Sequence, residues 1–212
     1  MAKIRKIDRV PGNGRRNYYL VDACFLVNNY IPIAIAPSVG DQKRLTACRE
    51  WWDEIHAQLN ANKARVYVPD VCIAEAYKVL AKKYYTERWF KSTASFRGAR
   101  QKMVKDISLP ARMLKAQARR VRFHDISTSR DIIIAVDRFY EMLMKQSIEV
   151  QLPDLILLAT GKYLMDFFDI PKNRLHIVTL DRKLRRGTQK IQELPNAYDP
   201  TEASDSVGRI FR

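Results

Sequence analysis

Short apolar segments that alternate with helix-like segments constrain the fold of this chain more than any other feature. The apolar segments are residues 18–22 (YYLVD), 65–68 (RVYV), 120–126 (RVRFHDI) and 175–180 (LHIVTL), with a weaker one at 192–197. Strands that are buried on both faces are nearly continuous apolar runs, and parallel strands are joined by helical crossovers. The alternation therefore predicts a three-layer α/β/α sandwich around a central parallel sheet.

The segments between the predicted strands have the hydrophobic spacing and the capping residues of helices. The expected helices cover residues 23–30, 41–60, 71–85, 89–117 (with a break near Pro110), 128–146 and 153–168. The buried face of the second helix is marked by Leu45, Cys48, Trp52, Ile55 and Leu59. We expect Asp41 to cap the second helix and Asp70 to cap the third. Ser127 or Thr128 is expected to cap the fifth.

The chain of 212 residues has a net charge of +15, and this excess is concentrated in two segments. Residues 78–122 contain fourteen Lys or Arg and two acids, and residues 1–17 contain six and one. The remaining segments, 18–77 and 123–212, have net charges of −2 and 0. Fourteen cations against two acids exceed what solubility requires, so we expect a polyanionic partner.

This charge distribution predicts a near-neutral domain that is interrupted by a basic insertion. The expected parts are a basic N-terminal tail (1–17), an α/β domain (18–200) with a basic, mainly helical insertion at about 82–120, and a C-terminal tail (201–212). Cations interleaved with aromatic rings suit single-stranded nucleic acid. The expected RNA-binding residues of the insertion are Arg88, Lys91, Arg97, Arg100, Lys102 and Lys105. The rings of Trp89, Phe90 and Phe96 would either stack on bases or pack the insertion onto the core.

Composition and motifs exclude several other classes of protein. The longest apolar stretches, residues 31–37 and 155–159, are far shorter than the roughly 20 residues that span a membrane. Residues 23–28 lack the G-x-G-x-x-G turn of a dinucleotide-binding site. The three cysteines form no C-x-x-C pair, so we expect reduced thiols in a cytoplasmic protein.

Four acidic residues are expected at the carboxyl edge of the sheet, where open parallel sheets bind ligands. Asp22 and Asp181 follow predicted strands, and Glu75 and Asp154 lie in the first turns of predicted helices. Each one alone is compatible with a turn, a helix cap or an exposed position. Together they would repel one another, by about 4 kcal/mol for two charges about 4 Å apart at an effective dielectric constant near 20. Protons, Lys or Arg side chains, or a hard cation such as Mg²⁺ or Mn²⁺ must therefore neutralise them.

The segments around these acids resemble the PIN-domain family of metal-dependent ribonucleases. The similar stretches are Tyr19-Leu-Val-Asp22 with Phe25-Leu26, Val68-Pro-Asp-Val-Cys-Ile-Ala-Glu75, Leu152-Pro-Asp154-Leu-Ile-Leu-Leu-Ala159 and Ile177-Val-Thr-Leu-Asp181-Arg182. Each stretch is short, and their order and their strand or helix contexts are the more specific part of the resemblance. It covers about residues 18–80 and 121–198 and leaves the insertion unmatched.

The resemblance implies a PIN-like fold and cleavage of single-stranded or looped RNA with one or two Mg²⁺ or Mn²⁺ ions. The family's four acidic positions, with catalytic and metal-binding roles, fall on Asp22, Glu75, Asp154 and Asp181. Thr179 falls where a hydroxyl group often supports the site. The chain departs from the family at Ala23 and Cys24, where the family often has Thr or Ser followed by Asn.

Two other functions are compatible with the same sequence. One is a non-catalytic RNA-binding subunit of a ribonucleoprotein, which would use the same basic segments. The other is a toxin ribonuclease that is held by an antitoxin, and PIN-like proteins of this kind often form homodimers. The chain is longer than the compact toxin ribonucleases, since 79 residues separate Glu75 from Asp154. This length favours a nuclease with its own RNA-binding insertion.

Overall fold

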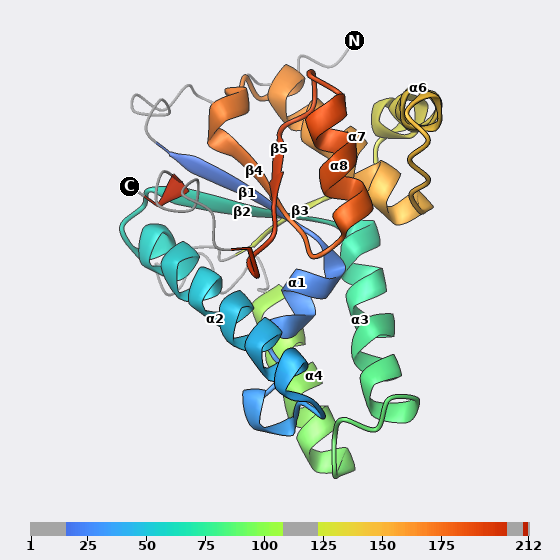
Figure 1. Cartoon of the computed structure of the whole chain (residues 1–212). Coiled ribbons are helices and arrows are strands. Elements are labelled where there is room, and N and C mark those ends of the chain that lie inside the picture. Colours follow the sequence, from blue (N-terminus) through green and yellow to red (C-terminus); the bar gives the residue numbers. More distant parts are fainter. Residues whose placement is uncertain (1–15, 108–122, 203–209, 212) are drawn as a thin grey trace.

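The computed structural model describes residues 16–107, 123–202 and 210–211, and a five-stranded parallel sheet lies at its centre (Figure 1). The strands are β1 (Asn17–Val21), β2 (Ala64–Pro69), β3 (His124–Ile126), β4 (Leu175–Val178) and β5 (Asn196–Tyr198). Their order across the sheet is β3-β2-β1-β4-β5. The central strand, β1, is buried along its whole length because it pairs with β2 on one side and with β4 on the other.

Helices cover both faces of this sheet. The helices are α1 (Ala23–Asn28), α2 (Val39–Asn60), α3 (Asp70–Tyr85), α4 (Thr93–Ile107), α6 (Arg130–Lys145), α7 (Leu152–Phe167) and α8 (Arg182–Lys190), with short 3-10 turns η2 (Ile33–Ile35) and η3 (Lys172–Arg174). The hydroxyl of Tyr19 donates to Gln58 Oε1 of α2 at 2.9 Å. The next residue, Leu20, lies against Gly161 of α7. Because neighbouring strand residues point to opposite faces, α2 and α7 lie on opposite sides of the sheet, and the predicted three-layer sandwich is confirmed.

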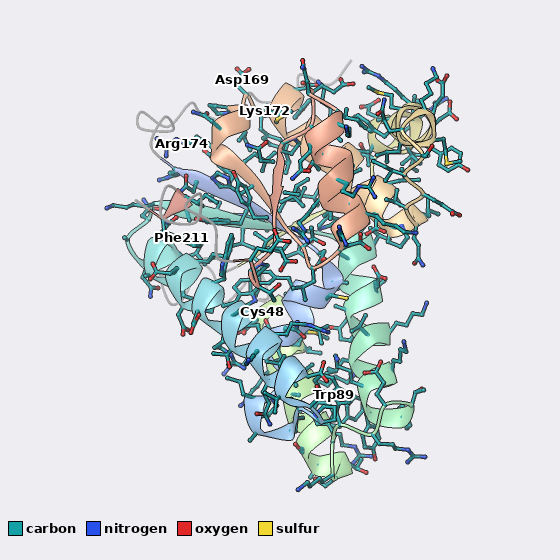
Figure 2. All side chains as sticks on the ribbon, viewed as in Figure 1. Cys48, Trp89, Asp169, Lys172, Arg174 and Phe211 are labelled. Carbon is teal, nitrogen blue, oxygen red and sulfur yellow. The ribbon has the colours of Figure 1, made fainter. Side chains whose placement is uncertain are left out.

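The described part of the predicted basic insertion contains the end of α3, a loop and α4, and its aromatic side chains are buried. Figure 1 shows α4 below the sheet, beside the end of α3. Trp89, Phe90 and Phe96 are only 5–8% exposed. The ring of Phe96 stacks on that of Tyr84 with centroids 4.5 Å apart, and Lys83 Nζ lies 3.3 Å from the Trp89 ring centroid. Figure 2 labels Trp89 between α3 and α4. These buried rings therefore pack α4 and the loop before it against the end of α3 and are not free to stack on bases.

Three helix caps differ from the expectation. The hydroxyl of Ser38, not the carboxylate of Asp41, caps α2 by accepting from the backbone N–H of Asp41 at 3.0 Å. Asp70 is the first residue of α3, and its carboxylate accepts from the backbone N–H of Thr128 at 3.0 Å. Because Thr128 is engaged with Asp70, Ser129 caps α6.

The edges of the sheet also differ from the expectation. The fifth strand begins at Asn196 and not at residue 192, because residues 191–194 form a turn in which Leu194 N–H donates to Ile191 O at 3.1 Å. Pro195 follows and has no N–H to donate to a ladder. The predicted third strand and the predicted helix break at Pro110 fall partly on residues 108–122, which lie outside the described residues.

Two residues of the predicted C-terminal tail pack on the start of β1. The side-chain amide of Asn17 donates to Ile210 O at 2.6 Å. The ring of Phe211 lies edge-on to Trp51 of α2 at 5.1 Å, and Figure 2 labels it beside that helix. Among the helices of the described ranges, none has the length and apolar character to cross a membrane.

Candidate functional site

The four predicted acids lie at the ends of elements that meet at the carboxyl edge of the sheet. Asp22 directly follows β1, and Asp181 lies three residues beyond β4 and directly precedes α8. Glu75 lies in the second turn of α3, and Asp154 is the third residue of α7. Since β1 and β4 are neighbours and parallel, their carboxyl ends bring the first two acids to the same place.

Asp22 is the most buried of the four acids and is held at both carboxylate oxygens. Its Oδ1 accepts from the backbone N–H of Phe25 at 2.6 Å and so caps α1, and its Oδ2 accepts from Thr179 Oγ1 at 2.5 Å. Burial raises the pKa of Asp22 to about 6, and the charge of Glu75 raises it too, although these hydrogen bonds lower it. The ionised form of Asp22 is therefore costly in the folded protein without a compensating cation.

Asp154 lies close enough to the other three acids for their charges to affect its pKa. The pKa of Asp154 is raised to about 7, chiefly by burial. The negative charges of Asp181, Asp22 and Glu75 raise it as well. Asp154 Oδ2 accepts from Gln151 N–H at 3.2 Å, and Asp181 Oδ1 accepts from the backbone N–H of α8 at Leu184, 2.9 Å away. The four carboxylates thus lie within electrostatic reach of one another.

The carboxylates nevertheless do not form a closed ligand set. In the described part of the chain, no group of three or more His, Cys, Asp or Glu side chains is arranged so that it could hold a metal ion. Asp22, Asp154 and Asp181 each accept a hydrogen bond from the N-terminus of a helix. Helix N-termini stabilise nearby negative charge, so these bonds hold carboxylates in place that would otherwise repel one another.

Thr179 connects two of the acids. Its hydroxyl donates to Asp22 Oδ2 and accepts from the backbone N–H of Asp181 at 2.9 Å. The side chain itself is fully buried. The hydroxyl of Thr179, directly after β4, therefore supports Asp22 in this chain, where Ala23 offers no polar group.

Replacing Thr179 with Val is expected to raise the pKa of Asp22 further and to destabilise the protein by about 1–3 kcal/mol, because a buried carboxylate loses a donor. The pKa follows from the carboxyl ¹³C shift of Asp22 during a pH titration, and stability follows from urea unfolding. Thr46→Val, at an exposed position of α2, is the matched control. An unchanged titration of Asp22 in Thr179→Val would show that the hydroxyl has no such effect.

The predicted RNA-binding cations form a separate group. Arg88, Lys91, Arg97, Arg100, Lys102 and Lys105 are all exposed, on α4 and on the loop before it. Figure 1 shows that α4 extends away from the sheet. The acids are brought together by the sheet, whereas these cations belong to the insertion.

A second basic group, on α8, was not predicted. Its exposed members are Arg182, Lys183, Arg186 and Lys190. The remaining cation of the helix, Arg185, forms ion pairs with Asp199 at 3.0 Å and with Glu202 at 2.6 Å. The run RKLRRGTQK directly after Asp181 was the available signal in the sequence.

Comparison with known proteins supports the fold and leaves the family open. No family model matches the sequence, and no curated protein matches it. A chain of VapBC2 from Rickettsia felis, solved bound to a DNA fragment from its promoter, has 9% identity and a TM-score of 0.49 over 86% of this chain and 98% of that chain. A chain of FitAB, solved bound to an IR36 DNA fragment, has 12% identity and a TM-score of 0.51 over 88% of this chain and 97% of that chain. The second similarity, with the topology of the sheet, defines a PIN-like α/β/α fold.

Proposed function

We propose that this chain is a PIN-type ribonuclease that hydrolyses phosphodiester bonds of single-stranded or looped RNA with Mg²⁺ or Mn²⁺. The observation that carries the proposal is the meeting of Asp22, Glu75, Asp154 and Asp181 at the carboxyl edge of the sheet. Open α/β sheets bind their ligands at this edge. The PIN-like fold supports the same assignment.

The donor set suits a hard divalent cation. Carboxylate oxygens are the ligands that Mg²⁺ and Mn²⁺ prefer. Burial and neighbouring carboxylates raise the pKa values of Asp22 and Asp154, and a bound cation would offset this cost of ionisation. Asp22 and Asp154 would be the main direct ligands, with Glu75 and Asp181 completing the site directly or through waters. A bound cation would polarise the phosphodiester and lower the pKa of the attacking water.

The residues of the chain have their own parts in this scheme. Thr179 and the N-terminus of α1 fix both oxygens of Asp22, so this carboxylate is oriented before any ligand arrives. Asp154 and Asp181 keep one hydrogen bond each from a helix N-terminus, and these bonds limit how far the two side chains turn. The exposed cations of the insertion would bind RNA through phosphate contacts, since the aromatic rings among them are buried.

Glu75→Gln is expected to lower Mn²⁺-dependent cleavage of a single-stranded RNA by about 10–100-fold, because it removes one negative charge from the metal site. The matched control is Glu50→Gln, an exposed position of α2, which should cleave within about twofold of the wild type. Equal activity of Glu75→Gln and Glu50→Gln would contradict a role for Glu75.

One observation favours a second candidate function, a non-catalytic RNA-binding subunit. The described side chains include no ready-made metal site, while many exposed cations are present. In this case RNA binding would be tight and salt-sensitive, and neither Mn²⁺ nor Mg²⁺ would produce cleavage.

The likeness to a chain of FitAB supports a further version of the nuclease proposal. In that version a small protein partner of the antitoxin type restrains the enzyme. A small gene directly beside the gene of this chain, and co-purification of its product, would support that partner. A nuclease that is active alone, with no such gene beside it, would contradict it.

A further inference from the structure

We propose that the outer face of α8 binds the phosphate backbone of single-stranded RNA directly beside the acidic site. The proposal rests on the proposed function for the kind of nucleic acid and adds the surface that guides it to the carboxylates. The residues of this surface are Arg182, Lys183, Arg186 and Lys190, called here the α8 cations.

The α8 cations are exposed, and they form no ion pair with any acid in the part of the chain that the structure describes. Their neighbour Arg185 differs, because Asp199 and Glu202 neutralise it at the base of the helix. The fold therefore uses one cation of α8 to attach the helix and leaves four for a partner.

The orientation of the helix is fixed by its inner face. Leu184, Gly187 and Thr188 are buried. A side-chain carbon at Gly187 would lie 2.6 Å from Leu143 Cδ2 of α6, so the two helices are in close contact there. Arg182, Arg186 and Lys190 follow one another at intervals of four residues and share the opposite face.

The α8 cations begin at the acidic site and lead away from it. Asp181 caps α8 through Leu184 N–H, and Arg182 is the first helical residue. With a rise of about 1.5 Å per residue, the row from Arg182 to Lys190 covers about 12 Å. Figure 1 shows α8 beside the sheet and α4 below the sheet.

Such a row solves an electrostatic difficulty of the proposed reaction. Four carboxylates repel the phosphates of an approaching RNA, and a neighbouring row of cations offsets this repulsion. The partner is RNA and not an acidic protein, because the row is continuous with the site that would cleave the phosphodiester. The spacing of four residues between Arg182, Arg186 and Lys190 also suits a repeating backbone charge.

The test is RNA binding without cleavage. We would measure the fluorescence anisotropy of a labelled, about 20-nucleotide single-stranded RNA in EDTA, at several salt concentrations, with the wild type and with Arg182→Gln/Arg186→Gln. Lys43→Gln/Lys63→Gln is the matched control, since it removes the same charge from exposed positions of α2 and of the loop before β2. Thermal unfolding of each variant checks the fold.

Each phosphate contact to a single strand contributes about 0.7 to the salt slope, so the loss of two contacts corresponds to about 25-fold at 0.1 M salt. We expect the α8 variant to bind about 25-fold more weakly, with a slope shallower by about 1.4, and the control to stay within about twofold. Unchanged affinity and slope in the α8 variant would overturn the proposal. Equal losses in both variants would also overturn it, since they would reflect net charge alone.

The two proposals fail in different ways. If the wild type cleaves RNA with Mn²⁺ but the α8 variant binds RNA as the wild type does, only the α8 surface is wrong. If the α8 variant loses RNA binding and the wild type never cleaves, only the nuclease is wrong. A loss confined to duplex DNA of the same length, or a wild type that binds no RNA, would overturn the α8 surface as an RNA site.

Discussion

Asp154→Asn is expected to stabilise the metal-free protein at pH 8 by about 2–4 kcal/mol. The folded-state pKa of Asp154 is about 7, above its ordinary value of 3.8, so the folded state holds this proton more firmly than the unfolded state. The protonated carboxyl group of Asp154 therefore makes its full contribution to the free energy of unfolding below about pH 4, and this contribution is lost as the pH rises through 7. The substitution removes that loss, and urea unfolding in EDTA at pH 5 and pH 8 measures it.

The same experiment contains its own checks. The advantage of Asp154→Asn should be smaller at pH 5 than at pH 8, and Asp53→Asn, at an exposed position of α2, should change stability by less than about 0.5 kcal/mol. Saturating Mn²⁺ should stabilise the wild type, by about 2.7 kcal/mol at 100 times the dissociation constant, and should stabilise Asp154→Asn less. A variant that is less stable than the wild type at pH 8 would contradict the account of Asp154.

Asp22→Asn is expected to lower metal-dependent cleavage on the order of 1000-fold, the largest effect of any single change. Asp22 is buried at the end of the central strand, and both of its carboxylate oxygens are fixed by hydrogen bonds. The variant should still fold, because an asparagine oxygen can accept from Phe25 N–H as the carboxylate does. Thermal unfolding close to that of the wild type, together with lost cleavage, would separate a loss of chemistry from a loss of structure.

The sequence predicts the middle of the sheet well because the three central strands, β1, β2 and β4, are largely buried. Residues 18–22 are apolar up to Asp22, a pattern typical of a short strand that is buried on both faces. The same logic brings Asp22 and Asp181 to one edge of the sheet. The orientation of their carboxylates could not be predicted, because it depends on which helix N-terminus each side chain meets.

Errors arose where neighbouring residues compete for one role. Ser38 and Asp41 are both good caps and lie within one turn, so propensity alone cannot choose between them. Thr128 has the side chain of a good cap, but its hydroxyl donates a hydrogen bond to Asp70, 58 residues earlier in the chain. Contacts between distant segments decide such cases.

The surroundings of the basic residues could not be predicted from the sequence for a different reason. The aromatic residues of the insertion look the same in the sequence whether they face solvent or the core, and packing buries them. The α8 cations went unnoticed because residues 123–212 have a net charge of 0, with thirteen cations and thirteen acids. Averaging over 90 residues hid a nine-residue helix that contains five cations and no acid.

The most direct test of the acidic site is cleavage of a mixed single-stranded RNA pool by the wild type and by Asp22→Asn, each with Mn²⁺, Mg²⁺ or EDTA. We expect the wild type to cleave with Mn²⁺ or Mg²⁺ and to stop in EDTA, and Asp22→Asn to be inactive in all three. Cleavage that continues in EDTA, or that survives in Asp22→Asn, would contradict the metal-dependent site. Salt-sensitive RNA binding by both proteins without any cleavage would contradict the nuclease and support the RNA-binding subunit.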